Sequence, residues 1–350
     1  MTPTRLTQFS HGAGCGCKIA PAVLDSILKT SAPASAFPQL LVGNSSKDDA
    51  AVYDLGNGSS LICTTDFFTP IVDDAFSFGK IAGANAISDV YAMGGRPILA
   101  IAILGWPVDK LPAELAQQVL EGARSICAEA NIPLAGGHSI DTPEPIFGLA
   151  VNGLVDTKNI KQNNTAREGD LLFLTKPIGV GILATAQKRE VLKEEHSSLL
   201  LAQLGTLNRI GEALGKMDSV HAMTDVTGFG LLGHLIEMAE GSGLGATLSY
   251  GKIPVIAAAK EYLAQRIVPD ATYRNWNSYS TRVGFAPGVN VMEAFNLLPD
   301  PQTNGGLLIA VDPAGVDALV QLFSDHGLKD LAEPIGSLQQ AGDKLITVTQ

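Results

Sequence analysis

A glycine-rich segment near the N-terminus holds the residues whose types and spacing most clearly suggest chemistry. Residues 11–18 read His-Gly-Ala-Gly-Cys-Gly-Cys-Lys. Glycines on both sides of Cys15 leave its thiol unshielded and let the backbone adopt open conformations. Lys18 can lower the pKa of that thiol or contact a phosphate oxygen. We therefore expect Cys15 and Lys18 to form a catalytic pair in a mobile loop that spans about residues 8–20.

Two other interpretations of these cysteines are an N-terminal arm with incidental thiols and one half of a zinc site. A closed zinc site needs four ligands. Cys63 lies in an apolar predicted strand and Cys127 lies on the apolar face of a predicted helix, so we expect both to be core residues. The sequence thus favours a functional thiol over a zinc site, with Cys17 as a bystander.

Aspartates recur beside predicted strands and inside an apolar predicted helix. They are Asp48-Asp49 before one strand, Asp66 at the end of another, Asp89 within the helix and Asp225 before a further helix. Buried carboxylates cost desolvation energy unless a cation compensates, and hard oxygen ligands suit Mg²⁺. Each aspartate alone is as typical of a strand end or a helix cap. The set together favours a magnesium site.

Two further glycine motifs need separate interpretation. Gly136-Gly137-His138-Ser139 follows a short apolar strand and could offer N–H groups and a hydroxyl to a phosphate, although a turn histidine is equally typical of such a loop. Residues 228–233 match the dinucleotide fingerprint, but residues 250–253 read Tyr-Gly-Lys-Ile where the ribose-binding acid should lie. We therefore exclude a nicotinamide cofactor. The sequence also contains no Walker-type phosphate loop.

These residues need a scaffold, and the hydrophobic pattern predicts one of mixed strands and helices in both halves of the chain. In the first half the pattern predicts strands at 39–42, 50–53, 61–65, 97–104, 133–135 and 146–155, with helices at 77–93 and 112–130. The polar stretch 157–169 is the best candidate linker, which gives domains 1–157 and 168–350. Residues 269–287 are polar and aperiodic and are expected to be a surface excursion.

Composition limits the classes of function. The chain has 350 residues, 46% hydrophobic and 17% charged, with a net charge of -11. So acidic a protein is not expected to bind nucleic acid or an anionic membrane, but it can bind a polyphosphate if metal ions bridge the like charges. The longest apolar stretch, 98–108, is too short to span a bilayer, and no signal peptide is visible. We expect a cytoplasmic protein.

Taken together, these motifs resemble the selenophosphate synthetase (selenide, water dikinase) family in its bacterial cysteine-containing form. The resemblance covers residues 11 to 306, almost the whole chain. Seven stretches carry it in the right order: His11–Lys18, Lys47–Val52, Thr64–Phe68, Asn85–Asp89, Ala135–Ser139, Thr224–Gly230 and Asp300–Gly306. One departure is Asn304, where the family usually has Ser. The family also often has selenocysteine at the position of Cys15.

The resemblance implies a two-domain, aminoimidazole-ribonucleotide-synthetase-like α+β fold and a homodimer whose N-terminal domains build a shared β-barrel. It implies synthesis of selenophosphate from ATP, selenide and water, with release of AMP and orthophosphate, for selenocysteine and selenouridine synthesis. It makes Cys15 and Lys18 catalytic, with Cys15 either handling the selenium or shielding it. The implied magnesium ligands are Asp49, Asp89 and Asp225, and the implied ATP site is Lys18, Ser46, Lys47, Asp48, Asp66, Asp89, Gly137, His138 and Ser139.

Two rival functions fit parts of the sequence. One is another ATP-using enzyme of the same superfamily, such as a purine-precursor ligase or a thiamine-phosphate kinase, although we would not expect the Gly-Cys-Gly-Cys-Lys loop there. The other is a selenium- or metal-binding thiol protein without turnover. Formation of AMP from ATP and selenide would distinguish the first interpretation from both rivals.

Overall fold

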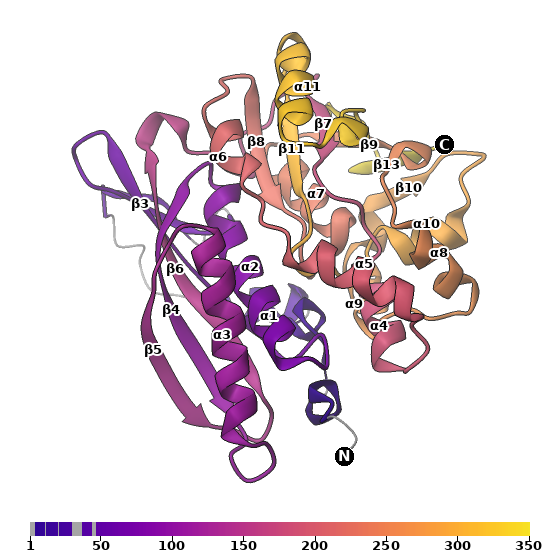
Figure 1. Ribbon diagram of the computed structural model, residues 1–350. Coiled ribbons are helices and arrows are strands. Elements are labelled where there is room, and N and C mark those ends of the chain that lie inside the picture. Colours follow the sequence, from indigo (N-terminus) through magenta and orange to yellow (C-terminus); the bar gives the residue numbers. More distant parts are fainter. Residues whose placement is uncertain (1–3, 11, 20, 30–36, 44–46) are drawn as a thin grey trace.

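A computed structural model describes residues 4–10, 12–19, 21–29, 37–43 and 47–350 of the chain. Two mixed β-sheets, each with its own helices, lie side by side (Figure 1). The mixture of strands and helices in both halves confirms the predicted α+β class. In the part of the chain that the structure describes, no helix has the length and apolar character needed to cross a membrane.

The first half contains one sheet and the helices that cover it. Its elements are α1 (Pro21–Leu28), β1 (Leu40–Val42), β2 (Ala51–Asp54), β3 (Ser59–Phe68), α2 (Ala75–Ala92), β4 (Arg96–Trp106), α3 (Ala113–Glu129), β5 (Leu134–Asp141) and β6 (Ile146–Asp156). The strand order is β1-β2-β3-β6-β4-β5, so β1 and β5 form the two edges. Pairing is antiparallel except between β4 and β5.

Helices α2 and α3 both cover one face of this sheet (Figure 1). Alternation along the strands sends Ile62 and Leu149 to the covered face, where both are fully buried. Helix α2 begins after Asp74, whose carboxylate accepts the Ser77 N–H at 2.8 Å, an N-cap interaction. The other face carries exposed side chains such as Phe67 and Ile101.

The second half contains the other sheet. Its helices are α4 (Val180–Lys188), α5 (Glu194–Gly205), α6 (Ile210–Gly215), α7 (Gly230–Gly241), α8 (Ala257–Ala264), α9 (Asp270–Tyr279), α10 (Val291–Leu297) and α11 (Val316–Asp325). Its strands are β7 (Leu171–Leu174), β8 (Val220–Asp225), β9 (Gly245–Ser249), β10 (Val283–Phe285), β11 (Leu307–Val311), β12 (Gly336–Gln339) and β13 (Ile346–Thr349). The strand order is β10-β13-β9-β12-β7-β11-β8.

Helix α2 joins the two halves. It contacts α3, β3 and β6 of the first half and α5, α6 and β8 of the second. Alanines and glycines let other elements approach it closely: a Cβ at Gly79 would lie 1.7 Å from the Val119 carbonyl oxygen of α3. A polar side chain on α2 therefore lies between two packed layers, which explains how Asn85, Ser88 and Asp89 come to be buried together.

Three local predictions are wrong. Residues 134–141 form a complete strand, β5, where we expected a strand that ended at 135 and a phosphate-binding loop at 136–139. Residues 270–279 form α9 instead of a surface excursion, and its buried face contains polar side chains such as Asn275. Cys63 is exposed on the open sheet face, because Ile62 takes the covered position. Cys127 is buried, as expected.

Candidate active site

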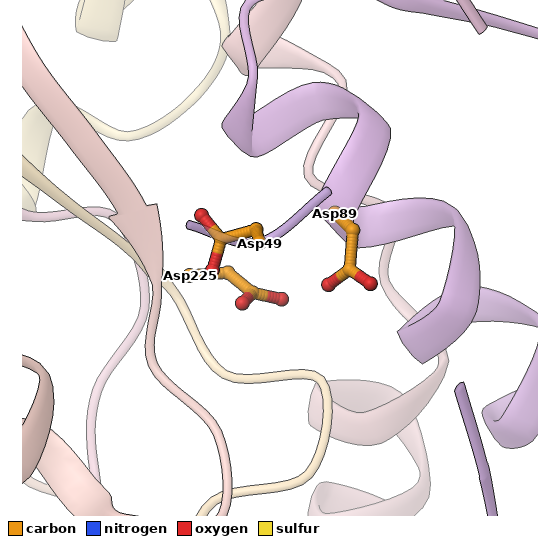
Figure 2. A group of neighbouring side chains, drawn as sticks. All are labelled: Asp49, Asp89 and Asp225. Atoms are coloured by element: carbon orange, nitrogen blue, oxygen red, sulfur yellow. The ribbon is translucent and has the colours of Figure 1, made fainter. Parts of the chain in front are cut away.

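Three aspartates from separate elements meet at the junction of the two halves. Asp49 precedes β2, Asp89 lies in the last turns of α2, and Asp225 is the final residue of β8. One carboxylate oxygen of each lies within 4.8 Å of the others (Figure 2). Asp89 and Asp225 are buried. The structure thus brings together the three residues that the resemblance implied as magnesium ligands.

The electrostatics of this cluster are unfavourable without a cation. Burial, then the charges of the neighbouring carboxylates, raise the pKa of Asp49 and of Asp89 well above the usual value, and burial also raises the pKa of Asp225. Thr224 Oγ1 donates to Asp49 Oδ1 at 2.9 Å, and Thr64 Oγ1 donates to Asp89 Oδ2.

One buried oxygen of Asp49 and one of Asp225 have no hydrogen-bond partner among the described residues. An all-oxygen set with open acceptor sites is the environment that a hard divalent cation prefers. The residues present therefore fit a magnesium ion.

Cys15 lies in a short 3₁₀ turn, Cys15–Cys17, and contacts Asn85, which lies one helical turn before Asp89 in α2. It is only 1% exposed, its Sγ donates to Asn85 Oδ1 over 3.4 Å, and its backbone N–H donates to Thr303 Oγ1 at 2.9 Å. Burial and the charge of Asp66 raise the pKa of this thiol well above its usual value, although Lys18 lowers it. The expectation of an unshielded, acidified thiol is therefore wrong for this closed arrangement. Cys17, by contrast, is exposed.

Lys18 follows the turn and reaches toward the same acids. Its Nζ donates to Thr227 Oγ1 over 3.4 Å and lies 6.0 Å from the centre of the Phe229 ring. Desolvation of the ammonium opposes its charge, but the carboxylates, first among them Asp66, raise the pKa of Lys18 above its usual value. The residue as a whole remains exposed to solvent, while the charges of Asp66, Asp89 and Asp225 favour its protonated form. Lys18 is therefore a fixed cation beside the aspartates.

The segment before Asp49 is held by the linker between the two halves. The Asn163 backbone N–H donates to Asp48 Oδ1 at 2.7 Å, and Asn163 Nδ2 donates to the Lys47 carbonyl oxygen at 2.8 Å. Lys47 has a positive φ of 55°, so the chain turns sharply before it reaches Asp49. Ser46, also expected in the ATP site, lies outside the described residues.

The Gly137-His138-Ser139 segment is not brought to the aspartates within one chain. Asp66, Leu149, Ala102 and Gly137 form one row across β3, β6, β4 and β5, so Gly137 lies three strands from Asp66, about 14 Å away. Asp66 itself lies inside β3, not at its end, and accepts a hydrogen bond from Asn85 Nδ2. His138 and Ser139 lie on an exposed edge strand.

Comparison with known proteins decides the family. The model for the N-terminal domain of AIR-synthase-related proteins matches residues 47–155, and the model for their C-terminal domain matches residues 167–348. The chain is 55% identical over 351 residues to the selenide, water dikinase of Aeromonas salmonicida, with 100% of both chains covered. It is 56% identical to that of Colwellia psychrerythraea, with 99% of both covered. The chain belongs to the selenide, water dikinase family.

Solved structures share the fold of this family member at low sequence identity. Thiamine-monophosphate kinase from Stenotrophomonas maltophilia is 20% identical with a TM-score of 0.65, covering 95% of this chain and 96% of that one. The hydrogenase maturation protein HypE of E. coli is 20% identical with a TM-score of 0.62, covering 89% of each chain. The AIR-synthase-like, two-domain fold is therefore confirmed.

Several residues that hold the site together were not predicted from the sequence. Asn85 is the hub: its Oδ1 accepts from the Cys15 thiol and from the Asn304 N–H at 2.7 Å. Asn304 donates through Nδ2 to the carbonyls of Leu204 and Thr206 at 2.6 and 2.8 Å. It has a φ of 47°, a conformation that asparagine tolerates well. The motif at residues 300–306 was the sequence signal that could have pointed to Asn304.

Proposed function

We propose that this chain synthesises selenophosphate from ATP, selenide and water, with release of AMP and orthophosphate. The observation that carries the proposal is the full-length identity of 53–56% to proteins named selenide, water dikinase. Three clustered aspartates, two of which act by charge on Lys18, support it, as does the contact of the Cys15 thiol with Asn85. The superfamily rivals are not favoured, because their solved relatives are 20% identical or less. Selenophosphate made in this way would supply selenocysteine and selenouridine synthesis.

The aspartates would hold the metal. We assign Asp49, Asp89 and Asp225 as ligands of magnesium, which would neutralise the triphosphate in an acidic protein and orient its phosphates for displacement. Thr224 and Thr64 fix one oxygen each of Asp49 and Asp89, and one oxygen of each of the three aspartates lies within 4.8 Å of the others before any ion binds. Such preorganisation lowers the cost of assembling the site.

Lys18 and Cys15 would act on the phosphates from positions close to the aspartates. The Lys18 ammonium stabilises the negative charge that accumulates on the transferring phosphoryl group. The Cys15 thiol, buried and protonated in the closed loop, excludes water from this point and keeps the attacking selenium away from solvent. Asp66 holds Lys18 by charge, while Asp48 and Lys47, which contact Asn163 of the linker, would border the ATP site.

We also propose a homodimer. The open face of the first sheet exposes large apolar side chains, each between 41% and 57% exposed: Tyr53, Phe67, Ile101 and Ile140. Apolar surface of this extent is typical of a protein interface. His138 shares this face with Phe67, because both lie in the row Phe67, Gly148, Ile103 and His138.

A barrel shared between two copies would bring the edge strand β5 of one copy toward the site of the other. Gly137, His138 and Ser139 would then contact ATP across the interface.

Phe67→Asp should convert the dimer to a monomer in size-exclusion chromatography with light scattering, whereas Val108→Asp, at an exposed position outside the strands, should not. A monomeric wild-type protein would contradict the proposed dimer.

In each copy we place the domain division between 1–157 and 168–350.

The function is tested by supplying ATP, magnesium and selenide under anaerobic conditions and separating the nucleotides by chromatography. AMP should form only when selenide is present. Formation of ADP alone would favour a simple kinase of the same fold, and no turnover would favour a binding protein.

A further inference from the structure

Two cations from the second half of the chain hold the glycine-rich loop by its backbone. Lys188, the last residue of α4, donates through Nζ to the carbonyl oxygens of Ser10 at 3.0 Å and Gly12 at 2.9 Å. Arg274, in α9, donates through Nη2 to the Gly16 carbonyl oxygen at 2.7 Å. The carbonyls of Gly12 and Gly16 lie on either side of Cys15. The loop is thus held before and after its buried thiol.

Backbone carbonyls are the acceptors that this loop can offer, because its glycines and alanine present no polar side chain to the second half. Hydrogen bonds from charged donors are about twice as strong as neutral ones. Among the described residues, the neutral contacts of the turn include Cys15 N–H to Thr303 Oγ1 and Gly14 N–H to the Thr69 carbonyl at 3.1 Å, and the charged contact of Lys18 Nζ to Thr227 Oγ1 is longer, at 3.4 Å. The two cations therefore supply the strongest polar contacts between this turn and the second half.

Next to the hydrogen bonds of Lys188 and Arg274, the loop and the second half are separated by open space. A cavity of about 780 Å³ lies between the loop and the second half, and Gly12, Gly16, Lys188 and Arg274 all line it. The two side chains cross the edge of this open space to reach the loop. Without them, the loop would keep weaker contacts on this side, such as that of Cys15 to Thr303, and Cys15 could move away from Asn85.

We propose that Lys188 and Arg274 are positioning residues that hold the glycine-rich loop closed, with Cys15 buried against Asn85 and Lys18 held beside the aspartates. The effect on turnover rests on the proposed function, but the effect on the loop itself does not. Neither residue is assigned to contact ATP, metal or selenide.

The four cysteines allow the loop to be tested directly. Cys15 is 1% exposed and Cys17, two residues later, is exposed, while Cys127 is buried in the core. Alkylation of Cys15 by iodoacetamide requires the loop to open, Cys17 reports intrinsic reactivity, and Cys127 reports global unfolding. Rates are measured for each cysteine by mass spectrometry on the full-length protein without substrates.

We expect Lys188→Met to raise the alkylation rate of Cys15 about tenfold and Arg274→Gln about threefold, since Lys188 makes two contacts and is less exposed. The rates of Cys17 and Cys127 should not change. The matched controls Lys193→Met and Arg282→Gln remove cations whose partners are Glu261 and Glu240, away from the loop, and should leave Cys15 at its wild-type rate. An unchanged Cys15 rate in Lys188→Met, or a parallel rise at Cys127, would overturn the proposal.

Kinetics supply a second readout. In Lys188→Met, kcat for selenide-dependent AMP formation should fall about tenfold while affinity for an ATP analogue, measured without selenide, stays within about twofold. Lys188→Arg, which keeps a donor at this position, should restore most of the rate. If the wild type makes no AMP, the proposed function fails and the alkylation result still decides the loop inference. A wild-type kcat in Lys188→Met would overturn the inference while leaving the function intact.

Discussion

The aspartate cluster and the glycine-rich loop meet at one point but are built in opposite ways. The aspartates come from, or directly adjoin, regular elements (β2, α2 and β8), and Thr224 and Thr64 fix two of them. The loop contributes one short 3₁₀ turn whose position depends on side chains from distant parts of the chain, among them Thr303 and Lys188.

The difference indicates a division of labour. Charges that must bind a metal and a polyphosphate benefit from a rigid arrangement, because reorganisation during the reaction costs free energy. A thiol that must first meet selenide and then exclude water needs to be exposed and buried in turn. Rigid carboxylates and a loop that opens and closes satisfy both needs. Substitutions in the two regions should therefore impair the protein in different ways.

The largest effect is expected in the loop. Cys15→Ser should lower selenide-dependent AMP formation by at least about a hundredfold, because the thiol lies at the centre of the closed site. Cys17→Ser should retain most of the activity, because Cys17 is exposed. Anaerobic AMP assays on the two single variants measure both. Equal losses would show that the position of the first cysteine has no special role.

Substitution of the aspartates should have two opposite effects, weaker magnesium-dependent binding of nucleotide and higher stability of the metal-free protein. Asp49→Asn and Asp225→Asn should weaken magnesium-dependent binding of a non-hydrolysable ATP analogue at least about tenfold, or about 1.4 kcal/mol, in calorimetry. Without magnesium, Asp49→Asn should raise the Tm, because it removes one of several charges whose burial and mutual repulsion destabilise the folded state. Asp156→Asn, at the exposed end of β6, is the control. Unchanged affinity would make these aspartates structural.

A pH effect confined to stability concerns Lys176, which donates to the carbonyls of Thr206 and Asn304 at 2.7 and 2.9 Å. Burial lowers its pKa from 10.5 to about 7, against the charge of Asp225. The unfolded chain then binds more protons than the folded one between these values, so the contribution of Lys176 to the free energy of unfolding rises with pH from about 7 to 10.5.

The difference in unfolding free energy between wild type and Lys176→Met should therefore be constant below pH 7 and should increasingly favour the wild type above it. Urea unfolding at a series of pH values measures this difference, with Lys193→Met as the control. A difference that does not vary with pH would contradict the lowered pKa.

Local patterns predicted much of this molecule. The hydrophobic pattern located α2, predicted at 77–93 and observed at Ala75–Ala92, and the sequence placed Asp89 inside it. The complete strand β5 was missed because Gly136 and Gly137 are poor strand formers, and pairing with β4 overrides that preference. Helix α9 was missed because polar Asn275 faces inward, where it donates to the carbonyls of Gly228 and Pro299.

The contacts that complete the site could not be read from the sequence. Asn85 meets Asn304 across 219 positions, and Lys188 meets Gly12 across 176. A lysine that binds a distant carbonyl has no local signature. The burial of Cys15 was missed for the same reason, because flanking glycines predict exposure unless another part of the chain covers them.

The most direct test of the account follows the phosphorus atoms themselves. Phosphorus NMR of ATP, magnesium and ⁷⁷Se-enriched selenide with the wild-type protein should show one new resonance split by coupling to selenium, together with equal amounts of AMP and orthophosphate. Neither Cys15→Ser nor Asp49→Asn should produce it. ADP without a selenium-coupled resonance would contradict the central claim that the loop and the aspartates together transfer a phosphoryl group to selenide.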